Sequence, residues 1–287
     1  MSKIKKGKTI TVLFAVLMLT GCGIVAIGYN YAGVYLRYSI NSYASFNDQQ
    51  KETIKRDVNN YMSWHRMTML PDYVLFLKEL QTLVQTHAEI NNNDVAHSRL
   101  QARSLYINTL RPTIIPATTL LRSVDNGQIQ EMILALAKDN KKLKEKELGD
   151  TLEEGLDKRS ERTINFIENF VDGLNDKQLD IVRLLSHKLP YTSALNIKLR
   201  ENNQDRLIEL LKNHAGEEEI AAFLTNWLER PEESRSSEEQ KLISAFESAA
   251  DVMVVEIYHL LTDRQKHSLD KNIVKYIDTF QDLASKN

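Results

Sequence analysis

Apolar residues recur every three or four positions along most of the chain, which is the spacing of one face of an α-helix. Tyr73, Leu77 and Leu80 show this spacing in one segment. No segment alternates apolar and polar residues over a length that is typical of a β-strand. The pattern therefore predicts an all-α protein, a multi-helix bundle built from antiparallel helical hairpins.

Prolines and polar turns divide this pattern into separate helices. The residue before a proline disfavours helix, so we expect breaks at Leu70-Pro71 and Arg111-Pro112. Asp125-Asn126-Gly127 predicts a turn. The expected helices cover about residues 48–69, 73–90, 95–110, a short piece ending near 124, 128–149, 151–173, 175–189, 193–214 and 217–228, with two more after the polar loop 230–237.

Tyr31, Tyr35 and Tyr38 lie on one face of a short helix near the N-terminus. Helical stripes of this kind usually pack against protein, so we expect a core face. The alternative is a face at the lipid headgroups, where tyrosines are enriched in membrane proteins.

The first residues have the layout of an export signal. Four lysines and no acid occupy residues 1–8, an apolar run follows from Thr9, and the run leads to Leu19, Thr20, Gly21 and Cys22. This tetrad resembles the lipobox of bacterial lipoprotein precursors. In that family the cysteine thiol is alkylated with diacylglycerol, the chain is cut before the cysteine, and the new amine is acylated.

The lipobox resemblance implies a division of the chain and a location. Residues 1–21 would be the signal peptide, residues 22–45 the lipidated Cys22 with an aromatic juxtamembrane segment, and residues 46–287 an all-helical periplasmic domain. Several acyl chains anchor a protein stably, so we expect the lipid bilayer as a partner through Cys22. Because Gly23 and not Asp follows the cysteine, the resemblance favours the outer membrane, facing the periplasm.

A signal anchor is the alternative to lipidation. The apolar run continues past Cys22 to Gly28 and reaches about the ~20 residues that a membrane-spanning helix needs. On that interpretation the protein stays in the inner membrane with its N-terminal helix uncleaved.

Three segments share the pattern of an apolar residue, Asn or Thr, Asp, any residue and Gln. The first polar residue suits a helix N-cap, Asp suits the positive helix end, and Gln can bond back to the cap as in a capping box. We therefore expect three helix starts. The residues concerned are Asn47, Asp48 and Gln50, then Asn175, Asp176 and Gln178, and finally Thr262, Asp263 and Gln265.

Two family resemblances follow from these motifs. The third copy, Leu261 to Gln265, looks like the Leu-Thr-x-x-Gln element of periplasmic envelope-stress chaperones. Most of the mature chain resembles a family of uncharacterised proteobacterial lipoproteins that carry a helical domain of unknown function, which implies relatives and a location but no chemistry. The residues that carry this second resemblance are Tyr29-Asn30-Tyr31-Ala32, Gln50, Trp64, Arg66, Leu70-Pro71-Asp72-Tyr73, Leu174 to Gln178, Leu189-Pro190, and Leu261 to Gln265 with Tyr276, Phe280 and Leu283.

Charge and cysteine content narrow the range of functions. Removing the four lysines of residues 1–8 from the 37 Lys+Arg leaves 33 against 39 Asp+Glu, a net charge of −6 for the mature chain. Such a surface gives no electrostatic reason to expect nucleic acid as a partner. The chain has one cysteine, so it forms no internal disulfide, and lipidation of that cysteine excludes thiol catalysis.

Few residues suggest catalysis. Glu256 and His259 have the Glu-x-x-His spacing of di-iron bundles, but the sequence has no second such pair. We therefore expect no metal, no cofactor and no enzyme, but a binding or chaperone-like protein with protein or peptide clients; a metal-assisted enzyme is the alternative. Trp64 and Arg66 are a candidate binding surface, although a core tryptophan and a cation at a helix C-terminus explain them as well.

The lipobox resemblance predicts that Cys22→Ser releases the protein from membranes or leaves an unprocessed precursor. Globomycin, which inhibits the lipoprotein signal peptidase, should make a larger form accumulate. Cell fractionation and immunoblotting measure both effects. Unchanged processing and fractionation under both treatments would favour the signal-anchor alternative.

Overall fold

The computed structural model describes residues 21–86 and 89–286. This part of the chain is helical almost throughout and contains no strand, which confirms the all-α bundle. The α-helices are α2 (Gly21–Asn41), α3 (Asp48–Trp64), α4 (Leu70–Gln85), α5 (Asn92–Leu110), α6 (Ile114–Arg122), α7 (Asn126–Glu147), α8 (Leu152–Glu168), α9 (Asp176–Lys188), α10 (Ser193–Lys212), α11 (Glu217–Glu229), α12 (Ser237–Leu260) and α13 (Asp263–Ser285).

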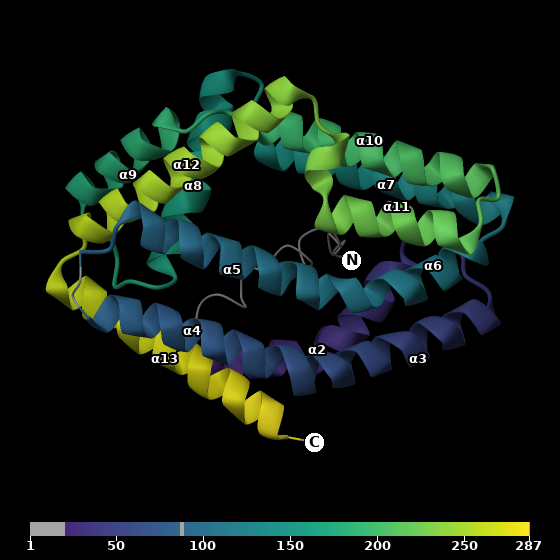
Figure 1. Cartoon of the computed structure of the whole chain (residues 1–287), viewed down its shortest axis with the longest axis horizontal. Coiled ribbons are helices and arrows are strands. Elements are labelled where there is room, and N and C mark those ends of the chain that lie inside the picture. The colour runs from purple at the N-terminus through teal and green to yellow at the C-terminus, as the bar shows by residue number, and fades with distance from the viewer. Residues whose placement is uncertain (1–20, 87–88, 287) are drawn as a thin grey trace, which may run out of the picture.

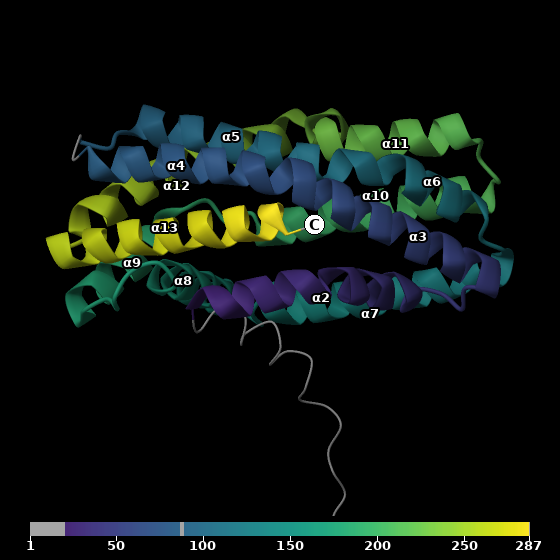
Figure 2. The ribbon, with the colours of Figure 1, turned by 90° about the horizontal axis from the view of Figure 1, so that it is seen from below.

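The helices run around an elongated, flattened molecule (Figures 1 and 2). Neighbours in sequence pair as hairpins, as in α2 with α3 and α8 with α9. The most extensive contact, however, joins α4 to α13, which are far apart in the chain. Figure 2 places α2 along one edge of the molecule and α5 along the opposite edge.

The expected break at Leu70-Pro71 is wrong. A π-helical turn, His65–Met69, joins α3 to α4 without interruption, and Leu70 donates its backbone N–H to His65 O. Pro71 then lies in the first turn of α4, directly after the π-helical turn, a position that accommodates proline.

The expected break at Arg111-Pro112 is also bridged by a helical turn. A 3₁₀ turn, Arg111–Thr113, connects α5 directly to α6, and Pro116 falls in the first turn of α6. Residues 48–85 and 92–122 therefore form two long, nearly continuous rods, instead of the separate helices expected at these positions.

Buried apolar residues form two main clusters at different ends of the molecule. One cluster draws on α3, α7, α10 and α11, and the other on α4, α12 and α13. The first contains Phe46, Ile54, Val58, Ile129, Met132, Ile208, Leu211 and Ile220, and the second Val74, Val84, Ile90, Val171, Tyr258, Ile273 and Ile277.

All three copies of the Gln motif begin a helix with a capping box. The side chains of Asn47, Asn175 and Thr262 each accept a bond from the backbone N–H of the glutamine three residues later. The glutamine Oε1 in turn accepts the backbone N–H of the cap residue, at 2.9–3.0 Å.

A fourth copy was missed in the sequence. Asp125 caps α7, and Gln128 completes the box. The segment Asp125-Asn126-Gly127, expected as a turn, is therefore the cap and first turn of the helix. This copy does not match the sequence pattern, because Asp125 stands where the other copies have Asn or Thr and Asn126 stands where they have Asp.

The four glutamines are buried and bind one another in two pairs. Gln50 Nε2 donates to Gln128 Oε1 at 3.1 Å, and Gln128 Nε2 donates to Gln50 Oε1 at 2.7 Å. Gln178 and Gln265 make the same reciprocal bonds at 2.8 and 3.0 Å. We call each pair a glutamine clasp.

Each clasp also holds the loop that precedes its partner helix. Every Nε2 donates to the carbonyl five residues before the other glutamine: Gln50 to Ser123 O, Gln128 to Ser45 O, Gln178 to Leu260 O and Gln265 to Gly173 O, at 2.5–3.1 Å. The two clasps therefore share one register. Since α3 and α7 begin at one end of the long axis and α13 begins at the other, a clasp closes each end (Figure 1).

Helix α9 is held at its C-terminus as well. The buried Arg159 of α8 donates to Ser186 O at 2.5 Å, to Leu189 O at 3.0 Å and to Pro190 O at 2.9 Å. Its guanidinium meets the negative end of the α9 dipole and replaces the carboxylate that a buried arginine usually needs.

The segment Thr151-Leu152-Glu153-Glu154 has the residue types of a capping box, but at the start of α8 the box forms only in part. Thr151 Oγ1 accepts the backbone N–H of Glu154, but the Glu154 carboxylate accepts from Asp150 N and not from Thr151 N. The Glu154 carboxylate thus accepts from the residue before the cap, and not from the cap residue as in a complete capping box.

Breaking one clasp should destabilise the protein. Gln178→Leu removes both bonds between Gln178 and Gln265 and the bond to Leu260 O, so buried polar groups lose partners, which costs about 1–3 kcal/mol in the free energy of unfolding. The double variant Gln178→Leu/Gln265→Leu should cost less than the sum of the two single changes, as urea unfolding would show.

Gln130→Leu is the matched control, because Gln130 lies exposed on α7. Its effect should stay within about 0.5 kcal/mol. Additive effects of Gln178→Leu and Gln265→Leu would show that the clasp does not act as a unit.

Candidate functional site

The glutamine motif is built into the fold and is not a binding surface. Its glutamines are buried, and every polar atom of their amides has a partner. Of the lipobox residues, Leu19 and Thr20 lie outside the described residues. Gly21 and Cys22 lie in the first turn of α2, and their side chains are likewise outside the description.

Trp64 and Arg66 flank a cluster of rings at the π-helical turn. The Trp64 ring is half-buried, with its centroid 5.7 Å from that of Tyr61 and 6.4 Å from that of His65. Tyr29 of α2 and Tyr73 of α4 pack against the other sides of His65, at 5.7 and 5.6 Å. A π-helical turn often marks a functional position, because it re-aims side chains that a regular helix would place elsewhere.

Arg66 is a C-terminal cation, but for a different helix from the one expected. Its NH1 donates to Leu283 O at 3.2 Å and to Lys286 O at 3.1 Å, at the end of α13. Its NH2 donates to Asn30 Oδ1, and the guanidinium lies over the Tyr29 ring. Arg66 therefore ties α2 and α13 to the π-helical turn.

His65 is the polar centre of this ring cluster. Its Nδ1 lies 2.9 Å from the Tyr29 hydroxyl, and the Tyr73 hydroxyl bonds to Thr109 Oγ1 of α5. Burial lowers the pKa of His65 and raises the pKa of Tyr29 and Tyr61 to about 12. All these groups are therefore neutral at pH 7 and hydrogen-bonded into the fold.

An apolar cavity of about 380 Å³ lies beside this cluster, between α2, α3 and α6. Its volume falls within the ~300–1,000 Å³ of small-molecule sites. Most of its wall is aliphatic or aromatic, and the polar side chains are few. The wall includes Leu36, Ile40, Phe46, Ile54, Val58, Pro112, Pro116, Ala117, Leu120, Leu121, Val124 and Met132, together with Ser39, Thr53, Asp57, Tyr61 and Thr113.

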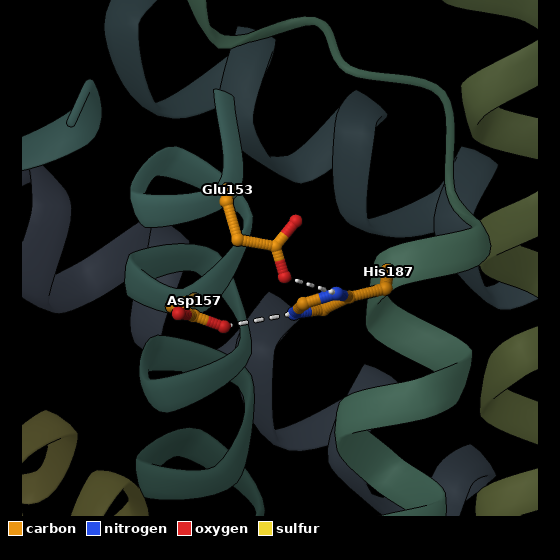
Figure 3. A group of neighbouring side chains, drawn as sticks. All are labelled: Glu153, Asp157 and His187. Carbon is orange, nitrogen blue, oxygen red and sulfur yellow. Dashed lines mark ion pairs between the residues drawn. The ribbon is translucent and has the colours of Figure 1, made fainter. Parts of the chain in front are cut away.

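One group of three possible metal ligands comes together within the described residues: Glu153 and Asp157 on α8, and His187 on α9 (Figure 3). His187 Nε2 lies 3.1 Å from Asp157 Oδ1, and its Nδ1 lies 3.9 Å from Glu153 Oε1. The two exposed carboxylates thus face different nitrogens of one ring. A single ion binds only one of those nitrogens, so this geometry is that of ion pairs across the α8–α9 hairpin.

Glu256 and His259, which the sequence singled out, are both exposed on α12. They belong to no group of three ligands in the part of the chain that the structure describes.

The expectation of a core face for Tyr31, Tyr35 and Tyr38 is wrong. These side chains are 66%, 51% and 63% exposed. The inward face of α2 is formed instead by residues such as Leu36 and Ile40, which pack on the first core cluster. Over residues 21–86 and 89–286, no helix combines the length and the apolar character needed to cross a membrane.

A family model matches residues 42–240, which is more than half of the chain. The chain belongs to DUF6279, a family of unknown function. No curated protein and no solved structure matches the chain significantly.

The DUF6279 match begins directly after α2 and ends within α12. It includes both glutamines of the first clasp and Gln178 of the second. Helices α2 and α13 lie outside the matched range, although α13 packs along α4 and supplies Gln265. The folded unit of this DUF6279 protein is therefore larger than the family match.

The buried His65 predicts a pH dependence of stability. Its pKa in the folded protein lies below the usual 6.5, so below that pH the unfolded chain binds a proton that the folded protein does not. Stability should therefore fall as the pH falls below about 6.5, until the folded-state pKa is reached. Urea unfolding between about pH 7.5 and pH 5 measures this loss.

His65→Gln should flatten this part of the pH dependence. His267→Gln, which changes an exposed histidine of α13, controls for the loss of a histidine as such. The same pH dependence in wild type and His65→Gln would contradict the assignment.

Proposed function

We propose that this DUF6279 protein is a lipid-anchored, non-enzymatic binding protein of the bacterial cell envelope, and that the cavity between α2, α3 and α6 takes an acyl chain. The single observation that carries the proposal is the largely apolar wall of that cavity. The lipobox resemblance at Leu19 to Cys22 supports the anchor and the location.

An acyl chain is the ligand class that fits the wall. Burial of apolar surface contributes about 25 cal/mol per Å², so a long alkyl chain gains affinity without directional contacts. The polar side chains in the wall are hydroxyls and a single carboxylate, that of Asp57. Asp57 is ion-paired with Arg56 Nε at 2.9 Å, and the lining of the cavity includes no cationic side chain, so a ligand with an uncharged head fits it better than a free fatty acid.

Binding rather than catalysis is supported by the chemistry beside the cavity. The ring cluster beside the cavity, His65 with Tyr29 and Tyr61, is hydrogen-bonded into the fold and packs α2 on α3. A metal-assisted reaction is the alternative, and metal analysis of the purified protein tests it. Stoichiometric metal that is lost on Glu256→Gln or His259→Gln would favour the alternative.

A chaperone-like activity toward protein clients is the narrower form of the proposal. Because Gln178 and Gln265 are buried in a clasp, the Leu-Thr-x-x-Gln motif gives it no support as a client surface. The support is instead the exposed apolar side chains of α2. Suppressed aggregation of a denatured model protein at near-stoichiometric ratios would support shielding, and aggregation equal to that with an inert protein would reject it.

Photo-crosslinking tests the cavity. A photoactivatable alkyl probe with an uncharged head, added to membranes that hold the full chain, should form adducts on the α6 residues of the wall, such as Leu120 and Leu121. Ala117→Phe fills the cavity and should reduce these adducts at least about tenfold, which corresponds to 1.4 kcal/mol of lost binding. Mass spectrometry of α6 peptides measures the yield.

Ala102→Phe is the matched control, because Ala102 is exposed on α5, away from the cavity wall. It should leave the α6 adducts unchanged. Equal labelling of α6 in wild type and Ala117→Phe would contradict the cavity as the binding site.

A further inference from the structure

The outward face of α2 is an uncharged stripe. Ile27, Tyr31, Val34, Tyr35 and Tyr38 are all more than half exposed and follow one another at helical spacing. The stripe is about 16 Å long, at ~1.5 Å per residue. Such a contiguous apolar face is unusual on a surface in water and marks an interaction site.

The opposite face of α2 is occupied by the protein itself. Gly33 faces α3, since a Cβ there would make van der Waals contact with Met62 Cγ at 3.4 Å and Val58 Cγ1 at 3.8 Å. Tyr29 and Asn30 bond to His65 and Arg66. Helix α2 is therefore held in place on the body and lies along its edge (Figure 2).

A basic groove runs beside the stripe, between α2 and α3. It has a volume of about 670 Å³ and is lined by Arg37 and Arg66, by two asparagines and by Tyr29, Gly33, Val34, Met62, Ser63 and Met67, with no acidic residue. Arg37 donates to Asn59 Oδ1 and Arg66 to Asn30 Oδ1. Neither guanidinium pairs with a carboxylate in the described part of the chain. Arg66 already donates to the carbonyls at the end of α13, so Arg37 is the more available charge for an anion.

We propose that α2 lies flat on the bilayer, with the tyrosine stripe at headgroup depth and the Arg37–Arg66 groove against the phosphates of anionic lipids. This inference rests on the proposed lipid anchor. Cys22 is in the first turn of α2, so acyl chains on it would bring the same helix to the membrane surface. Tyrosine rings suit this depth because they are apolar with a polar tip.

Site-specific fluorescence tests this orientation. Cys22 is the one cysteine of the chain, so in the lipidated protein an introduced cysteine is the single reactive thiol. Tyr35→Cys and the matched control Tyr106→Cys, which replaces a 61% exposed tyrosine of α5 on the opposite edge, would each carry an environment-sensitive dye. The full lipidated proteins would be placed in vesicles of phosphatidylethanolamine and phosphatidylglycerol.

A quencher attached to lipid should act several-fold more strongly on the dye at position 35 than on the dye at position 106. Iodide in the water should show the reverse order. Equal access of iodide to both positions would overturn the proposal. Protection of position 35 in native membranes but not in lipid vesicles would also overturn it, and would assign the stripe to a protein partner.

The groove is tested by lipid charge. Replacing phosphatidylglycerol with phosphatidylcholine should weaken lipid quenching at position 35, and Arg37→Gln should remove this dependence. Arg206→Gln, at an exposed arginine of α10, should retain it. If Arg37→Gln retains it as well, the groove does not bind lipid phosphate.

The lipid anchor itself is checked separately. Labelling of Cys22 in the wild-type protein, or failure of that protein to remain with vesicles, would reject the anchor and not the orientation of α2.

Discussion

A pair of buried glutamine amides that begin two helices is the interaction on which the arrangement of this protein depends. Each glutamine accepts the amide of its own cap residue and a bond from its partner, and donates to the partner and to the loop before the partner helix. All donors and acceptors of the four amides are therefore used. A buried polar network of this kind stabilises strongly when complete and costs free energy when any member is lost.

The clasps place helix starts side by side, and each clasp lies next to one of the two apolar core clusters. The clasp of Gln50 and Gln128 lies beside the first core cluster, and that of Gln178 and Gln265 beside the second. Between them the rods of residues 48–85 and 92–122 span the molecule, bent through a π turn and a 3₁₀ turn instead of broken at proline. The second clasp holds the N-terminal end of α13, α4 packs along its length, and Arg66 caps its C-terminal end.

Local interactions were predictable from the sequence, and the long-range ones were not. The all-α fold and the caps at Asn47, Asn175 and Thr262 follow from residue types within four positions of each other. The pairing of Gln50 with Gln128 joins residues 78 positions apart, and nothing in a helix-start motif encodes its partner. A capping glutamine already has a local role, so its second role across the interface leaves no separate signal in one sequence.

The candidate site was harder to predict for the same reason. Periodicity shows that Tyr31, Tyr35 and Tyr38 share a face, but it does not show which face the body covers. The packing of Leu36 and Ile40 on the first core cluster decides that. Similarly, Trp64 and Arg66 were found as a motif, whereas the groups that Arg66 contacts, Tyr29, Asn30 and Leu283, come from α2 and α13. The cavity is shared by α2, α3 and α6 and has no linear signature.

Native-state amide hydrogen exchange tests the central role of the clasps most directly, because the first turn of a helix normally frays. The capping boxes at Asn91–Asp94 and Ser236–Glu239 have the same local bonds but no glutamine clasp, and they serve as internal references. The account predicts that the backbone N–H groups of Gln50, Gln128, Gln178 and Gln265 exchange as slowly as those of the core. They should exchange far more slowly than the backbone N–H groups of Asp94 and Glu239. Equal, fast exchange at all six helix starts would contradict it.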